Sequence, residues 1–166
     1  MNLYLIRHAD AMPVGGLVTQ DADRRLSPRG EDDAVLMGRA LALLEPGVDI
    51  IVTSPLVRAI RTGEIIGKEV SNHAMMHVSE HLAPGFNNKA LFRELLSLGA
   101  GSNMIAVGHQ PDMSDFISFL ISGDQSASVA MAAGSIARIV VEGLQPQGHL
   151  EWLLTPEAVR RVSGGL

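Results

Sequence analysis

Two arginines and two histidines stand near the ends of apolar segments, and together they have the chemistry to bind an anion. Arg7 and His8 follow one such segment directly, His109 follows another, and Arg58 comes shortly after a third. Guanidinium groups bind oxyanions through parallel hydrogen bonds, and each imidazole adds one or two further polar nitrogens. These residue types therefore favour an anion with several acceptor oxygens, such as a phosphoryl group.

Strands that alternate with helices must position these side chains. The segments 2–6, 49–53 and 103–109 are continuous apolar runs, which are typical of strands buried on both faces of a sheet. Ser27 and Ser54 each precede a proline, and we expect them to cap the first two helices. Helical spacing and capping residues predict the following helices: one from Pro28 to the Pro46–Gly47 break, then 55–68, 87–98, 111–121 and 156–162.

Three further segments complete the predicted sheet. We expect a short strand at 75–79 and an antiparallel pair at 135–142 and 149–155. The alternation predicts an α/β fold of three layers, with a mostly parallel sheet between helices on both faces. No repeat or linker interrupts the chain, so we expect one domain over residues 1–166. Ligands of such sheets bind beyond the carboxyl ends of the strands, and this is where the four polar side chains should meet.

The composition excludes several classes of protein. Of the 166 residues, 46% are hydrophobic and 19% are charged, as in a globular protein. The net charge is −5 and the sequence has no basic block that would bind nucleic acid. No apolar run approaches the ~20 residues that span a bilayer, and the chain has no cysteine, so we expect a cytoplasmic protein. Aromatic residues are only 4%, and we therefore expect methionines to fill the core: Met75, Met76, Met104, Met113 and Met131.

Three motifs, in the expected order, resemble those of the histidine phosphatase superfamily, which has the phosphoglycerate mutase-like fold. "LIRHAD" (5–10) resembles the Arg–His–Gly signature of that family, with Ala9 in place of the glycine. "TSPLVRAIRT" (53–62) matches a Ser–Pro–x–x–Arg–Ala–x–x–Thr signature, and "IAVGHQP" (105–111) matches a Gly/Ser–His element. Because alanine is small, we expect the substitution at Ala9 to leave activity in place.

Within the superfamily the chain resembles the SixA phosphohistidine phosphatases, which are short and lack large capping insertions. "RRLSPRG" (24–30) and "VSEHLAPG" (78–85) are similar to two further segments of these proteins. The second segment contains Glu80, which the resemblance implies as general acid, although Asp10 is a rival two residues past His8. The first contains Arg24, a candidate for an additional phosphate contact.

The resemblance also implies a mechanism. His8 would be the nucleophile that carries the phosphoryl group, while Arg7, Arg58 and His109 would hold its oxygens and stabilise the transferred charge. No metal and no cofactor are implied. His73, His77 and His81 are spaced four apart, but on a strand successive members stand about 13 Å apart at ~3.3 Å per residue, too far to share one ion.

The expected function is therefore a metal-independent phosphatase with a phosphohistidine enzyme intermediate. A short chain without a cap suits a phosphohistidine displayed on another protein, such as a histidine phosphotransfer domain in signalling. A small-molecule phosphoesterase and a weakly active phosphate-binding regulatory module are the alternatives, and a mutase is less consistent with the chain length. We expect neither a nucleic-acid partner nor a membrane.

Overall fold

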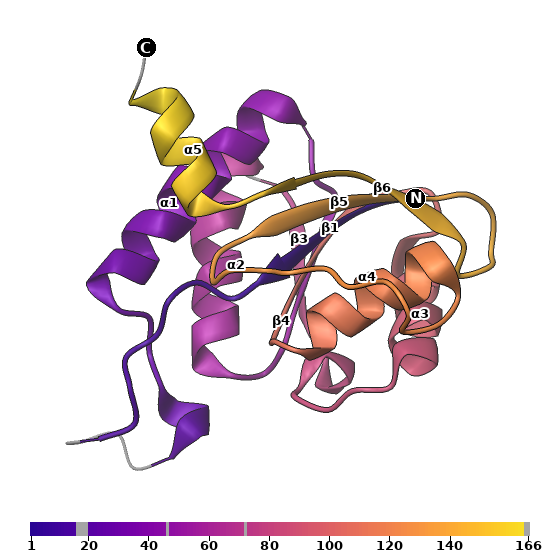
Figure 1. The fold of residues 1–166 in the computed structure, drawn as a ribbon, viewed down its shortest axis with the longest axis horizontal. Helices are drawn as coiled ribbons and strands as arrows, with labels where there is room; N and C mark the ends of the chain where they lie inside the picture. Colours follow the sequence, from indigo (N-terminus) through magenta and orange to yellow (C-terminus); the bar gives the residue numbers. More distant parts are fainter. Residues whose placement is uncertain (16–19, 46, 72, 165–166) are drawn as a thin grey trace.

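The computed structural model of the chain describes residues 1–15, 20–45, 47–71 and 73–164, which form a six-stranded sheet between two layers of helices (Figure 1). In chain order the strands are β1 (Asn2–Arg7), β2 (Ile50–Thr53), β3 (Met75–Val78), β4 (Asn103–Gly108), β5 (Ile136–Val141) and β6 (Gly148–Leu154). The helices are α1 (Pro28–Leu44), α2 (Val57–Val70), α3 (Asn88–Gly99), α4 (Asp112–Ser122) and α5 (Pro156–Ser163), with short 3-10 turns η1 (Asp21–Asp23) and η2 (Glu80–Leu82).

The order of strands across the sheet is β3-β2-β4-β1-β5-β6. The first four strands in this order are mutually parallel, while β5 pairs antiparallel with β1 and β6 antiparallel with β5. The predicted α/β class, the mostly parallel sheet and the C-terminal antiparallel pair are confirmed.

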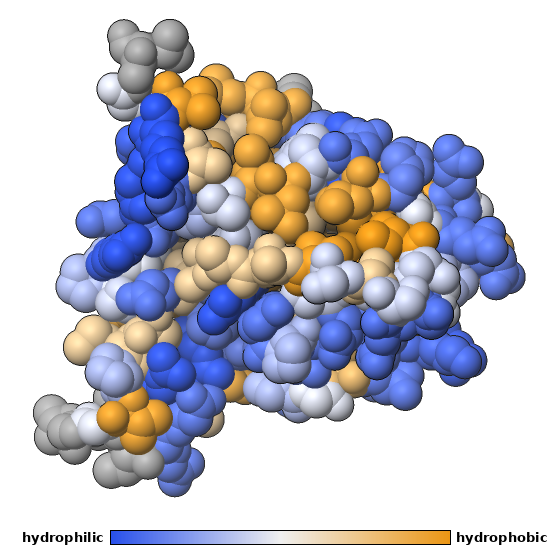
Figure 2. All heavy atoms as spheres, viewed as in Figure 1, coloured by the Kyte–Doolittle hydropathy of each residue, from blue (hydrophilic) through white to orange (hydrophobic). Residues whose placement is uncertain are grey.

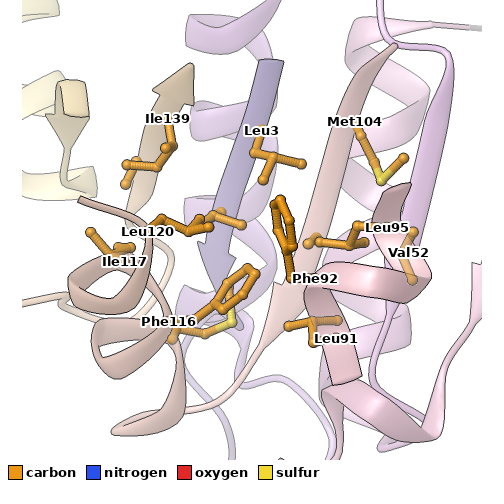
Figure 3. Close-up of a cluster of buried hydrophobic side chains, with 14 of the residues drawn as sticks. Leu3, Val52, Leu91, Phe92, Leu95, Met104, Phe116, Ile117, Leu120 and Ile139 are labelled. Carbon is orange, nitrogen blue, oxygen red and sulfur yellow. The ribbon is translucent and has the colours of Figure 1, made fainter. Parts of the chain in front are cut away.

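Alternating side chains of the central strands supply two separate hydrophobic cores. Leu3 and Leu5 of β1 pack with residues of α3 and α4, as Figure 3 shows for Leu3 beside Phe92 and Phe116. Tyr4, which is also fully buried, points to the opposite face and packs with α1 and α2. This period of two explains why β1 is apolar throughout: both of its faces are covered.

Most helix boundaries agree with the capping residues. The Ser27 hydroxyl accepts the Gly30 N–H, so α1 has the expected N-cap, and its C-cap is Glu45; the predicted break at Pro46 lies outside the described residues. The expectation that Ser54 caps the next helix is wrong. Helix α2 begins only at Val57, and Ser54 is instead buried at the end of β2, where its hydroxyl faces His109.

The methionines predicted to fill the core differ in their burial. Met104, Met113 and Met131 are buried as predicted, but Met75 and Met76 are 60% and 39% exposed. They lie on β3, which is an edge strand paired only with β2. The prediction that both fill the core is wrong because an edge strand of the sheet is less covered than a central one.

Apolar side chains also gather on one part of the surface. Figure 2 shows them over the upper part of the molecule, where α1 and α5 lie in Figure 1. Leu43 in α1 and Val162 in α5 are largely exposed. In the described ranges, no helix combines the length and the apolar character needed to cross a membrane.

Candidate active site

The ends of three adjacent strands bring the predicted residues together. Strand β4 lies between β1 and β2, with Arg7 opposite Gly108 and Thr53 opposite Val107. Residues that follow these pairs must therefore emerge at the same edge. The imidazole rings of His8 and His109 accordingly lie with their centroids 5.1 Å apart.

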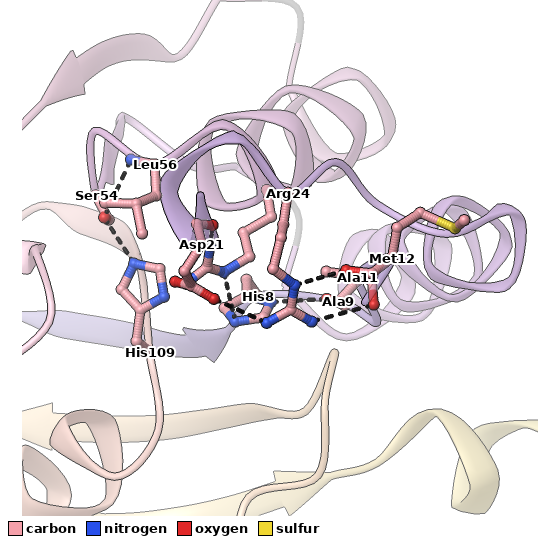
Figure 4. Close-up of polar contacts among 10 residues, drawn as sticks. His8, Ala9, Ala11, Met12, Asp21, Arg24, Ser54, Leu56 and His109 are labelled. Atoms are coloured by element: carbon pink, nitrogen blue, oxygen red, sulfur yellow. Dashed lines mark hydrogen bonds and ion pairs between the residues drawn. The ribbon is translucent and has the colours of Figure 1, made fainter. Parts of the chain in front are cut away.

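One cavity of about 340 Å³ opens at this edge. Arg7, His8, Arg58 and His109 all line it, although they come from three distant parts of the chain. Its remaining charged lining consists of Asp10, Asp21 and Arg24, all from the segment between β1 and α1. Figure 4 shows several of these side chains and the hydrogen bonds that link them.

His8 is held in one tautomer. Its Nδ1 lies 2.7 Å from the backbone oxygen of Ala9, and because a carbonyl oxygen can only accept, Nδ1 must carry the hydrogen. Nε2 is then unprotonated, and it accepts the Nε–H of Arg58 at 3.1 Å. Burial, reinforced by the charges of Arg58 and Arg7, lowers the pKa of His8 to about 4 although the bond to Ala9 opposes this. At neutral pH the residue is thus an uncharged imidazole with a lone pair on Nε2, as a nucleophile requires.

His109 and Arg7 each present a buried nitrogen that lacks a partner. His109 Nε2 lies 2.7 Å from the Ser54 hydroxyl, but Nδ1 is buried with no hydrogen-bond partner among the described residues. Burial, followed by the influence of His8 and Arg58, lowers the pKa of His109 to about 3. Arg7 donates from Nη1 to the Met131 oxygen at 2.7 Å, while its Nε is likewise buried and unpaired within that part of the chain. Unsatisfied buried polar groups each cost roughly 1–3 kcal/mol, which a bound oxyanion would recover.

Arg58 is almost fully buried and is held by Asp21, a residue that the sequence did not single out. Its Nη1 donates to the Asp21 backbone oxygen at 2.7 Å and its Nη2 to Oδ2 at 2.8 Å. The other carboxylate oxygen accepts Nη1–H of Arg24 at 3.0 Å, and this bond is the main reason why the pKa of Asp21 is lowered. A carboxylate therefore sits between two guanidiniums, in the kind of position that a phosphoryl group would take. The only available signal was an acidic residue three positions before Arg24, in a segment without regular spacing.

Arg24 makes its remaining contacts with the backbone. Nε donates to the Met12 oxygen at 2.6 Å and Nη2 to the Ala11 oxygen at 3.2 Å. Arg24 therefore ties the segment after β1 together as well as lining the cavity. Its direct contact with phosphate stays a prediction.

Thr62, from the second motif, explains how the alanine at position 9 is accommodated. The Thr62 hydroxyl donates to the Arg58 backbone oxygen at 2.7 Å and accepts the Ala9 N–H at 3.1 Å. Ala9 is fully buried, and among the described residues no position other than glycine has a positive φ. The methyl group thus fits without the backbone conformation that would demand glycine.

The two candidates for general acid occupy different places. Glu80 is exposed at the start of η2, and it does not belong to the lining of the cavity in the described ranges. Asp10 does line the cavity, and its Oδ2 accepts the Ser27 hydroxyl at 2.6 Å. Which of them donates a proton stays a prediction.

The histidines spaced four apart do not form a cluster that holds a metal. His77 lies on the exposed edge strand β3, and His81 lies in η2. Where the structure describes the chain, no group of three or more His, Asp or Glu side chains is arranged to bind an ion.

Comparisons with known proteins find similar sequences and similar folds. Residues 3–83 match the family model described as histidine phosphatase superfamily (branch 1). A structure of the protein histidine phosphatase SixA complexed with tungstate aligns with a TM-score of 0.84 and 22% identity, over 94% of this chain and 97% of that one. A structure assigned as SixA phosphohistidine phosphatase from Nakamurella multipartitia has a TM-score of 0.78 and 26% identity, over 93% and 95% of the two chains.

Other similar proteins are more varied. An uncharacterized protein of Picosynechococcus sp. is 28% identical over 154 residues, which is 91% of this chain and 92% of the relative. A structure assigned as an alpha-ribazole-5′-phosphate phosphatase from Escherichia coli shares the fold, with a TM-score of 0.68 and 20% identity over 94% of this chain and 98% of that one.

Proposed function

We propose that the chain is a member of the histidine phosphatase superfamily, and that it is a metal-independent phosphatase whose substrate is a phosphohistidine on another protein. One observation carries the proposal. The neutral, partly buried imidazole of His8 has its lone pair on Nε2 at a cavity where buried nitrogens of Arg7 and His109 lack partners. A phosphoryl group would supply both the atom to attack and the missing acceptors.

The reaction has two transfer steps. Nε2 of His8 attacks phosphorus, and the bond from phosphorus to the substrate nitrogen breaks with its electron pair. The other nitrogen of the substrate ring carries a proton, so the imidazole leaves neutral and the phosphoryl group is left on His8. Water then attacks phosphorus, the bond to Nε2 breaks, and inorganic phosphate leaves with one proton released or passed to a neighbouring base. Arg58, which donates to Nε2 in the free protein, would turn its N–H groups to the phosphoryl oxygens, because charged acceptors bind a guanidinium more strongly than a neutral imidazole.

The acidic residues of the cavity favour phosphohistidine over a phosphoester. An imidazole can leave as a neutral molecule, whereas an alkoxide leaving group needs a proton donor. Asp10 and Asp21 line the cavity but are exposed, and the hydrogen bond from Arg24 lowers the pKa of Asp21 further. Asp21 is not buried in the apolar surroundings that would keep a carboxylic acid protonated at neutral pH.

A small phosphoester is the second candidate substrate. The similarity to the alpha-ribazole-5′-phosphate phosphatase structure favours it, since that protein has the same fold. In this case Glu80 or Asp10 would have to protonate the leaving oxygen. The physiological partner that we expect is a histidine phosphotransfer domain, in the cytoplasm.

The experiment compares a phosphohistidine-bearing phosphotransfer domain with p-nitrophenyl phosphate, each with and without EDTA. We expect kcat/KM to be at least about tenfold higher for the phosphoprotein, a difference of ~1.4 kcal/mol in barrier, and to be unchanged by EDTA. His8→Ala should have no turnover, while His77→Ala, at an exposed histidine of β3, should equal the wild type. Equal or better turnover of the small ester would favour the second candidate, and an active His8→Ala would contradict both.

A further inference from the structure

The Ser54 hydroxyl makes two hydrogen bonds, and only one of them can use its hydrogen. Ser54 is completely buried. Its oxygen accepts the N–H of Leu56 at 3.3 Å, and it lies 2.7 Å from Nε2 of His109. A backbone N–H can only donate, so the bond to Leu56 leaves the hydroxyl hydrogen free for another acceptor.

Nε2 of His109 is the acceptor that this hydrogen finds in the described part of the chain. The Nε2–H tautomer would leave both the Ser54 hydroxyl hydrogen and the Nδ1 lone pair buried without a partner among the described residues, whereas the Nδ1–H tautomer leaves only one group unpaired. This count favours a hydroxyl that donates and an unprotonated Nε2. The hydrogen of the neutral imidazole then resides on Nδ1, which is the buried ring nitrogen without a partner. Figure 4 shows His109 with one nitrogen toward Ser54 and the other on the side of His8 and Asp21.

We propose that Ser54 is a positioning residue that fixes the Nδ1–H tautomer of His109, and so aims an N–H donor at the phosphoryl group that His8 receives. The inference rests on the proposed function and deepens it. Because burial lowers the pKa of His109 to about 3, the ring is neutral at working pH and has a single N–H to offer. In the other tautomer the lone pair of Nδ1 would face the phosphoryl oxygens and repel them, so the tautomer decides whether His109 helps or hinders transfer.

His8 and His109 thus have the same tautomer, although different partners fix it. The Ala9 carbonyl oxygen keeps the hydrogen of His8 on Nδ1, so that Nε2 is unprotonated and carries the lone pair that attacks. The Ser54 hydroxyl keeps the hydrogen of His109 on Nδ1 and makes that nitrogen a donor. His8 has an acceptor at Nδ1 and His109 has a donor at Nε2, and both contacts give the Nδ1–H tautomer. His8 is then the nucleophile through Nε2, and His109 is a hydrogen-bond donor through Nδ1.

The direct test is nitrogen NMR of the His109 imidazole in the free wild-type protein, with the signal assigned through His109→Asn. We expect an unprotonated Nε2 and a protonated Nδ1, and a protonated Nε2 in the wild type would overturn the inference. Ser54→Ala should shift the ring toward the Nε2–H tautomer and weaken tungstate binding by roughly tenfold or more, as for loss of one hydrogen bond to a charged group. Ser54→Thr retains a hydroxyl and should restore both properties.

The same measurements separate this inference from the proposed function. If Ser54→Ala and Ser54→Thr bind tungstate equally, the hydroxyl has no positioning role and the inference fails. If the NMR and tungstate results are as expected but no phosphohistidine is hydrolysed, the substrate assignment fails and the role of Ser54 stands. Should either variant not fold, as judged by thermal unfolding, the tautomer of the wild-type protein decides alone.

Discussion

The chemistry of single residues depends on keeping two imidazoles uncharged beside two arginines. His8 and His109 are neutral chiefly because burial disfavours the charged ring, and the nearby guanidinium of Arg58 adds to the effect. A protonated His8 would have no lone pair to attack with. The depressed pKa values therefore serve the proposed reaction, and they must cost stability when the pH falls.

We expect the free energy of unfolding to decrease as the pH falls below about 6.5, the usual pKa of an unfolded histidine, toward about 4. In this window the unfolded chain binds protons at positions 8 and 109 that the native protein does not bind, so acid favours unfolding. Urea unfolding at pH 7 and pH 5 measures the loss. The double variant His8→Gln/His109→Gln is the control and should lose clearly less, and equal losses would show that these residues titrate normally in the native protein.

Among the structural elements, the segment between β1 and α1 adds most to the site. Its η1 turn places the Asp21 carboxylate on Arg58 and Arg24, and its Arg24 holds the backbone of Ala11 and Met12. In the free protein Asp21 occupies donors that a phosphoryl group needs. It is also more than half exposed, which keeps this competition weak.

Asp21→Asn should therefore tighten the binding of inorganic phosphate, by up to about fivefold, the range expected for an exposed ion pair. Competitive inhibition of p-nitrophenyl phosphate hydrolysis by phosphate gives the affinity. Asp23→Asn, in the same turn but with no hydrogen bond from its side chain to the described residues, should leave affinity unchanged. Weaker phosphate binding by Asp21→Asn would mean that the carboxylate orients the arginines rather than competing for them.

The first turn of α1 supports the same segment through a close approach at Gly30. A Cβ atom there would lie 2.0 Å from the Asp10 backbone oxygen, and that oxygen accepts the N–H of Ser27 at 3.0 Å. Only glycine lets α1 approach the chain that leaves His8 so closely. This close approach explains why the segment "RRLSPRG" (24–30) ends with a glycine.

Gly30→Ala should lower stability by about 1–3 kcal/mol, as overpacking does, and should lower activity because it displaces Asp10. Gly67→Ala is the matched control, since a Cβ there would meet only the flexible end of Ile51. Urea unfolding and p-nitrophenyl phosphate turnover compare the two. A stable and fully active Gly30→Ala would show that the backbone at Asp10 can move to accommodate a Cβ atom at position 30 without loss of stability or activity.

The elements also show which features local sequence can predict. Apolar runs predict strands, and the residues just after β1, β2 and β4 were predictable because parallel strands end at one edge. Ser54 was misassigned because Ser–Pro is a common start of a helix, and only the pairing of β2 with β4 brings it to His109. The exposure of Met75 follows from the edge position of β3, which long-range pairing decides.

The whole molecule works as a frame that joins distant motifs. Two cores, one on each face of the sheet, fix β1, β4 and β2 side by side, so that Arg7, His8, Arg58 and His109 line one cavity. The fold was predictable from the alternation of strands and helices together with the family resemblance. The partners of each polar nitrogen were not, because they depend on side-chain geometry across the sheet edge.

The central claim is that this frame makes His8 the carrier of the phosphoryl group. It is tested most directly by mixing the wild-type protein with a phosphohistidine substrate, quenching during turnover under alkaline conditions, and locating the phosphoryl group by mass spectrometry of the peptides. We predict phosphorylation of His8, and none in His8→Ala. Turnover with the phosphoryl group on another residue, or on none at any time of quenching, would contradict the account.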